Sequence, residues 1–271
     1  MSGYISHSTG FKAISTNLGA NATVYAGLPM DPSIYFANPE EAENFEVGFK
    51  KTFSNGYLNM SFFHMAVEGY QSNLFIGTGF NLVNIGEQTN KGVEIDSLFF
   101  LNENFVVTFA ASYIDATYND FKNGPCDRTF VPPASDDCPI VNGGPARVKD
   151  FTGRRPSGVS ELAITVSGTY TFDLTENMTG YIRGEYVYED EYQATDAVPV
   201  EVPGAIRKVG TLNASLGVKD SASGFSLMLW GRNINDDEFI YTGFNVPGSP
   251  GSYAGYPVVP KMWGLTLSRE F

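Results

Sequence analysis

Residues 161–172 read ELAITVSGTYTF, and their alternation decides the fold. Leu162, Ile164 and Val166 share one parity with the aromatic residues that follow, and the intervening positions are mostly alanine, serine or threonine. Apolar and polar residues that alternate with period 2 predict a β-strand with one apolar and one polar face. The pattern recurs along the chain, up to a final strand that ends at Phe271.

The alternation predicts an all-β protein of ten antiparallel strands. Most are longer than the roughly 5–6 residues usual in soluble sheets, and they match the roughly 9–11 residues of a tilted membrane strand. In the third strand the apolar residues stand at even positions up to Phe62 and at odd positions from Phe63 onward. This switch predicts a β-bulge there. The strands are expected at about 2–12, 43–53, 57–71, 86–101, 105–118, 158–172, 178–192, 208–219, 224–235 and 258–271.

Short and long connections alternate between these strands. The short ones are about 54–56, 102–104, 173–177 and 220–223, and the long ones about 13–42, 72–85, 119–157, 193–207 and 236–257. Outer-membrane β-barrels have short periplasmic turns and long extracellular loops. The alternation therefore predicts a transmembrane barrel with Phe271 on the periplasmic side.

Composition excludes other classes of protein. No apolar run approaches the roughly 20 residues of a spanning helix, and a bilayer can otherwise be crossed only by a closed barrel. The formal net charge of −13 and the lack of a basic stripe argue against nucleic acid as a partner. The chain starts without a secretory signal, so we expect a mature form or, preferably, a fragment.

Two cysteines, Cys126 and Cys138, lie in the longest expected loop. On the orientation above this loop is extracellular, where the surroundings are oxidising, so a disulfide is predicted. Two cysteines without a nearby histidine do not complete a zinc site. We expect neither a metal nor another cofactor.

Charged residues also occur inside the predicted strands. On the lipid face near mid-depth an Arg or Lys costs about 2–4 kcal/mol, so these side chains are expected to face the lumen. They could contact an internal plug or a passing solute, or they could form a self-satisfied salt network across neighbouring strands. The predicted lumen charges are Glu46, Lys50, Glu94, Asp96, Arg183 and Glu185.

Catalysis has little support in the sequence. The two histidines are His7 and His64, and no serine or cysteine sits in a nucleophile motif. We therefore expect no enzyme.

Aromatic residues in the loops, including Phe239 and Tyr241, could stack on a ligand or form a girdle at the membrane interface.

Several segments, taken in order, resemble the barrel of TonB-dependent receptors. They are Gly10-Phe11-Lys12, Asn38-Pro39-Glu40, residues 44–50 (NFEVGFK), Asn84-Ile85-Gly86 with residues 91–96 (KGVEID), and residues 233–236 (NIND). The chain departs from that family at residues 13–16, where AIST replaces a glycine pair, and at Arg269, where an aromatic or apolar residue is commoner.

The resemblance implies a barrel of about 22 strands with a plugged lumen. Residues 1–271 would then be its C-terminal portion, without the plug and the earlier strands, and would form an open curved sheet if alone. It also implies an active transporter of a scarce solute, such as a ferric siderophore, a vitamin or an oligosaccharide, in the outer membrane of a Gram-negative cell. The implied partners are membrane lipid, the plug domain, the solute, an inner-membrane energy-coupling complex reached through the missing N-terminal part, and the assembly machinery that reads Phe271.

Two alternatives stay open at this point. The chain could be a self-contained ten-stranded outer-membrane barrel that acts as a passive pore. It could also be a protease similar to the omptins, in which His64, near the outer end of its strand, would act as a base.

Overall fold

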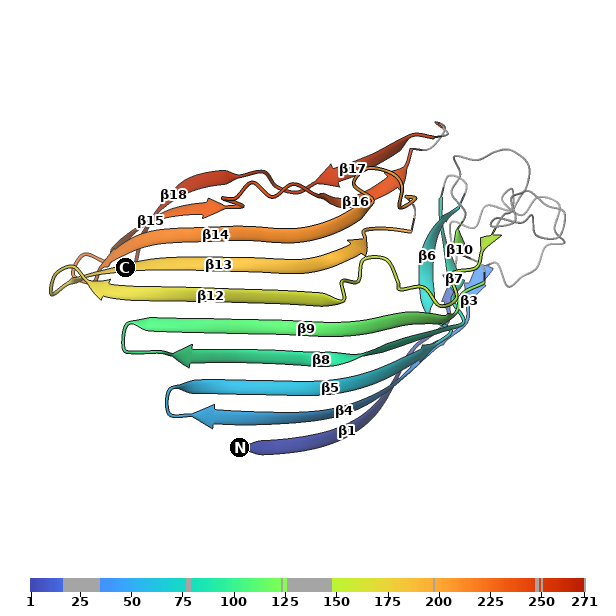
Figure 1. The fold of residues 1–271 in the computed structure, drawn as a ribbon, viewed down its shortest axis with the longest axis horizontal. Helices are drawn as coiled ribbons and strands as arrows, with labels where there is room; N and C mark the ends of the chain where they lie inside the picture. The colour runs from blue at the N-terminus through green and yellow to red at the C-terminus, as the bar shows by residue number, and fades with distance from the viewer. Residues whose placement is uncertain are drawn as a thin grey trace.

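The structure is a computed structural model that describes residues 1–16, 35–76, 79–122, 124–125, 148–196, 198–246, 249 and 251–270. Ten long strands form one antiparallel sheet in which sequence neighbours pair (Figure 1). This confirms the predicted strand number and fold class. The strands are β1 (Ser2–Lys12), β4 (Glu40–Phe53), β5 (Gly56–Glu68), β8 (Glu87–Phe100), β9 (Phe105–Asp120), β12 (Leu162–Asp173), β13 (Met178–Gln193), β14 (Ile206–Asp220), β15 (Phe225–Arg232) and β18 (Met262–Arg269).

The sheet is curved but not closed (Figure 1). β1 pairs only with β4, and β18 pairs only with β15, so each lies at an edge. Edge strands present unpaired backbone groups to their surroundings. In the described part of the chain, no helix is long and apolar enough to cross a bilayer.

All four short turns lie at one end of the sheet, which we call the turn end, and the long connections lie at the outer end (Figure 1). The long connections carry short strand pairs that the alternation did not predict, because two to six residues show too little periodicity. These are β2 (Ser15–Thr16) with β3 (Phe36–Ala37), β6 (Gln71–Ile76) with β7 (Gly79–Asn84), β10 (Gly124–Pro125) with β11 (Val148–Lys149), and β16 (Ile240–Asn245) with β17 (Tyr253–Pro257).

Cross-strand register gives the sheet an apolar and a polar face. Val47 pairs with Phe62, Phe62 with Val93, and Val93 with Tyr113, all on the apolar face. Val47 and Phe62 are each 51% exposed, and Leu265 is 68% exposed. A run of exposed large apolar side chains is what a lipid-facing surface requires.

The bulge predicted near Phe62 is wrong. β5 pairs without a register shift from Gly56 to Glu68 on both its neighbours. Phe62 lies on the apolar face, and Phe63 lies on the polar face, opposite Glu46 and Gly92. Apolar residues take over the polar face here because the outer part of that face is itself covered. Val67, which shares this face with Phe63, is only 6% exposed.

β15 pairs only with the half of β14 that lies nearer the turn end. Along the outer half of β14, side chains take the place of a neighbouring strand and bond to the backbone. Asn235 accepts from the backbone N–H of Leu212 at 2.8 Å and donates to the carbonyl of Gly210 at 2.6 Å. Asp237 accepts from the backbone N–H of Gly210 at 2.7 Å. The turn that follows β15 depends on Asn233, which is buried. Its φ is positive, at 48°, a conformation that asparagine tolerates better than most residues.

Candidate functional site

A hollow of about 500 Å³ lies on the polar face, between β1 and β12. It contains four of the six predicted lumen charges: Glu46, Lys50, Glu94 and Asp96. Register brings them together, because Lys50 pairs with Asn59 and Asn59 with Asp96, while Ser61 pairs with Glu94 one row further out. Four charges that are up to 50 positions apart in the sequence thus share one surface.

Small residues leave space in front of these charges. Gly48, between Glu46 and Lys50, has no side chain, and a Cβ there would collide with the ring of Tyr4. Tyr4 lies in that space and donates a hydrogen bond to Glu46. The far wall of the hollow is also built from small side chains: Ala110, Ser112, Ala163 and Thr165.

Within the described residues, the acidic groups in the hollow form no ion pair. None of the ion pairs in the described residues involves Glu46, Glu94, Asp96 or Lys50. Asp96 accepts a hydrogen bond from Asn59 at 2.9 Å, and Lys50 Nζ lies 5.7 Å from the centre of the Tyr4 ring. Three carboxylates therefore face one ammonium group, and the hollow attracts cations.

The other two predicted charges lie elsewhere on the polar face and satisfy each other. Arg183 donates to Glu185 at 2.9 Å along β13 and to Thr169 at 3.3 Å. Asn213 also donates to Glu185, at 3.3 Å. The salt-network interpretation fits this pair, and it does not fit the four charges of the hollow.

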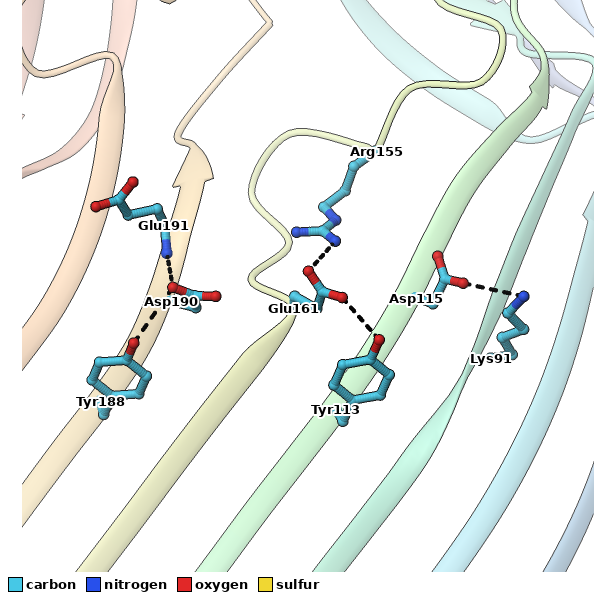
Figure 2. Close-up of polar contacts among 8 residues, drawn as sticks. All are labelled: Lys91, Tyr113, Asp115, Arg155, Glu161, Tyr188, Asp190 and Glu191. Carbon is cyan, nitrogen blue, oxygen red and sulfur yellow. Dashed lines mark hydrogen bonds and ion pairs between the residues drawn. The ribbon is translucent and has the colours of Figure 1, made fainter.

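A second polar cluster lies at the outer end of the apolar face, and we call it the outer polar belt (Figure 2). Lys91 and Asp115 form an ion pair at 3.1 Å. Arg155 and Tyr113 both donate to Glu161, at 2.7 and 2.8 Å, and these hydrogen bonds, that from Arg155 most, lower the pKa of the Glu161 carboxyl. The belt comprises Lys91, Tyr113, Asp115, Arg155, Glu161, Tyr188, Asp190 and Glu191.

Arg207 forms the most enclosed ion pair of the described residues. Its Nη2 lies 3.0 Å from Glu189, and its side chain is 13% exposed. Three aromatic rings surround the guanidinium at 4.7–5.4 Å, those of Tyr192, Phe239 and Tyr241. Phe239 directly precedes the β16–β17 hairpin, and Tyr241 lies within β16. Arg207 thus connects this hairpin to the outer ends of β13 and β14.

The histidines lie outside both polar sites. His7 contacts Glu43 at 2.8 Å and stacks on Phe45, with ring centres 4.4 Å apart. His64 lies opposite Phe45 and Lys91 in register, on the apolar face. Among the described residues, no three His, Cys, Asp or Glu side chains are arranged to hold a metal ion.

Cys126, Cys138 and Phe271 lie outside the described residues. Their roles, a disulfide and an assembly signal, stay predictions from the sequence.

An exposed apolar face, a polar inner surface and turns that alternate with long loops define a portion of a membrane β-barrel. The chain belongs to the family described as TonB dependent receptor-like, beta-barrel, whose model matches residues 1–234. Members of this family are transporters rather than enzymes, which excludes the protease alternative.

Solved structures show the same fold. The ferric yersiniabactin uptake receptor FyuA from Yersinia pestis has a TM-score of 0.68 at 14% identity, over 99% of this chain and 35% of that one. The siderophore receptor PiuA from Acinetobacter baumannii has a TM-score of 0.60 at 15% identity, over 98% and 33%. The ferric-catecholate import receptor Fiu from E. coli K12 has a TM-score of 0.57 at 18% identity, over 99% and 33%. The chain thus spans about a third of each, and no curated protein matches it.

Sequence reasoning missed the partners of the predicted charges. Tyr4, Asn59 and Ser61 lie on the same face as the predicted charges, and each shares a cross-strand row with one of them. Aligning the predicted polar faces of neighbouring strands could therefore have found them. Arg207 pairs in register with Tyr192, so the same reasoning could have found that ring, whereas Phe239 and Tyr241 belong to a long connection that the alternation did not place.

Proposed function

We propose that this chain is the C-terminal part of the barrel of an outer-membrane active transporter. The complete receptor would take up a scarce solute, such as a ferric siderophore, a vitamin or an oligosaccharide, with energy supplied from the inner membrane through parts outside this chain. The family supports this proposal, as do structural neighbours whose names include siderophore receptors.

The observation that carries the proposal is the acidic hollow. Within a barrel the polar face would line the lumen, and a plug that covered the exposed carboxylates of Glu94 and Asp96 would need to supply cationic groups to offset their desolvation. We propose that cationic groups of the receptor's own plug domain supply it. The solute would then bind further out, among the extracellular loops.

The open edges argue against a self-contained ten-stranded pore. Closure would need β1 to pair with β18, and the sheet leaves both unpaired on one side. We propose that the missing strands of a larger barrel pair with them.

The test is a paired neutralisation, Glu94→Gln with Asp96→Asn, in the complete receptor. Solute uptake by cells that depend on the receptor should fall, and the isolated barrel should keep its heat stability. Glu176→Gln, in an exposed turn, is the matched control because it removes an acid far from the hollow. Unchanged uptake in the double variant would contradict the proposed role of the hollow.

A further inference from the structure

The base of the β6–β7 hairpin covers the outer part of the polar face. Val67 pairs with Gln88, and Gln88 pairs with Tyr118, so all three lie on that face. Tyr118 packs in a buried apolar cluster with Ile85, which directly follows β7. β6 and β7 run across the direction of the long strands (Figure 1). The hairpin is thus fixed to the sheet further out than the hollow, on the side that would face the lumen.

A buried glutamine joins this hairpin to the first long connection. Gln71 begins β6 and is only 5% exposed. Its side-chain nitrogen donates to the carbonyls of Ala13 and Asn38, at 2.9 and 2.8 Å, and its side-chain oxygen accepts from the hydroxyl of Ser15 at 2.9 Å. A backbone carbonyl can only accept, so one orientation of the amide satisfies all three partners. Both described legs of the connection between β1 and β4 are therefore tied to one side chain.

Residues of the family-like segments strengthen the same contact. Asn84, at the end of β7, accepts from the backbone N–H of Asn38 at 2.7 Å and donates to its carbonyl at 3.0 Å. Glu40, at the start of β4, accepts from the backbone N–H of Gln71 at 2.8 Å. These hydrogen bonds give a structural role to two segments that the transport function left unexplained, residues 38–40 and 84–86. We call this set of residues the loop clamp: Ser15, Asn38, Glu40, Gln71 and Asn84.

We propose that the loop clamp is a positioning device for solute binding, with Gln71 as its central positioning residue. It holds the legs of the first long connection against the β6–β7 hairpin before the solute arrives. Loops that are ordered in advance bind more tightly, because less conformational entropy is lost on binding. Gln71 itself would not touch the solute, since its amide is buried and already paired. This inference deepens the proposed function and rests on it.

The first test is hydrogen exchange of the complete receptor in lipid vesicles. Gln71→Leu keeps an apolar side chain of similar size and removes all three side-chain hydrogen bonds of the clamp. Exchange at residues 13–16 and 35–38 should rise about tenfold, because the partners of Gln71 lose their bonds. Exchange along β5 should stay unchanged. Gln88→Leu is the matched control, because the Gln88 amide donates to Asn90 within β8, at 2.9 Å.

The second test is uptake of radioactive iron, supplied as ferric siderophores to cells that depend on the receptor. In Gln71→Leu the half-saturating concentration should rise about tenfold while the maximal rate stays unchanged. A receptor that was only assembled poorly would lose maximal rate instead. Gln88→Leu should match the natural receptor in both quantities.

Ser15→Ala is a milder variant that removes one hydroxyl from the clamp. Alone it should raise loop exchange and the half-saturating concentration about threefold. Added to Gln71→Leu it should change neither, because its partner is already lost. If Gln71→Leu does not assemble, Ser15→Ala decides the proposal.

Two results would overturn the proposal: loop exchange that stays at the natural level, or faster loop exchange with an unchanged half-saturating concentration. Absence of ferric siderophore uptake by the natural receptor would instead contradict the siderophore form of the proposed function. The exchange comparison would then still decide whether the clamp holds the loops.

Discussion

At the scale of single residues, the site depends on which charges find partners. Arg183 and Glu185 neutralise each other, whereas Glu94 makes no hydrogen bond or ion pair within the described residues. The sequence already separates the two cases: Arg183 and Glu185 are opposite charges two positions apart on one strand, whereas Glu94 and Asp96 are like charges at the same spacing. The neighbouring strands add polar residues to each pair, Asn59 and Ser61 beside Asp96 and Glu94, and Thr169 and Asn213 beside Arg183 and Glu185.

Asp196, in the β13–β14 connection, gives a prediction on pH. Burial raises the pKa of its carboxyl above the ordinary value, and a hydrogen bond from Ser157 and the charge of Arg154 only partly oppose this. A raised folded-state pKa means that the folded loop favours the protonated form. The loop should therefore be most stable in acid and should lose stability as the pH rises through the raised pKa. Hydrogen-exchange protection factors for residues 198–205 measure this.

In Asp196→Asn this dependence on pH should disappear, because the amide cannot ionise. Glu201→Gln, an exposed acid in the same connection, should keep the dependence of the natural chain. A loop whose protection rises with pH would contradict the assignment.

At the scale of elements, Arg207 holds the β16–β17 hairpin to the sheet. Arg207→Gln should loosen the hairpin by about 1–2 kcal/mol, because it removes the cation that stacks on Phe239 and Tyr241. Hydrogen exchange at residues 240–245 should increase. Arg207→Lys should restore little, since an ammonium group lacks the planar surface that stacks on the three rings.

Arg183→Gln is the control for this prediction, because it breaks an ion pair in the middle of β13 that no hairpin residue contacts. It should leave exchange in the hairpin unchanged. If both arginine variants loosened the hairpin equally, the effect would come from general destabilisation and not from the aromatic contacts.

The two faces of β12 give a second prediction at this scale. Val166→Arg places a charge on the apolar face and should cost about 2–4 kcal/mol in a bilayer. Thr165→Arg, its neighbour, lies on the polar face beside Asp96 and Ala110 and should cost much less. The free energy of unfolding of the complete receptor in lipid vesicles, from urea titrations, compares the two. Equal costs would mean that the faces are assigned wrongly.

At the scale of the whole molecule, the open edges predict how the chain behaves alone. β1 is exposed along its entire length, and β18 along nearly all of it. Edges of this length associate with other strands. The chain refolded alone in detergent should form oligomers or aggregates, and it should become monomeric when the upstream strands of the receptor are supplied. Light scattering measures the difference, and a stable conducting monomer would contradict the proposed larger barrel.

The sequence alone determined the ten strands, their two faces and the alternation of turns and loops. These are properties of periodicity and turn composition, which neighbouring residues set locally. Residues 161–172 carry that information without reference to any other strand.

Only the tertiary structure decided which residues act together. It brings Glu46, Lys50, Glu94 and Asp96 together in one hollow and leaves Arg183 and Glu185 outside it. It also shows that the bulge expected at Phe62 is absent. It also placed Phe239 and Tyr241 around Arg207. These results depend on cross-strand register and on the return of a loop over the sheet, and both are set by pairing between segments far apart in the sequence.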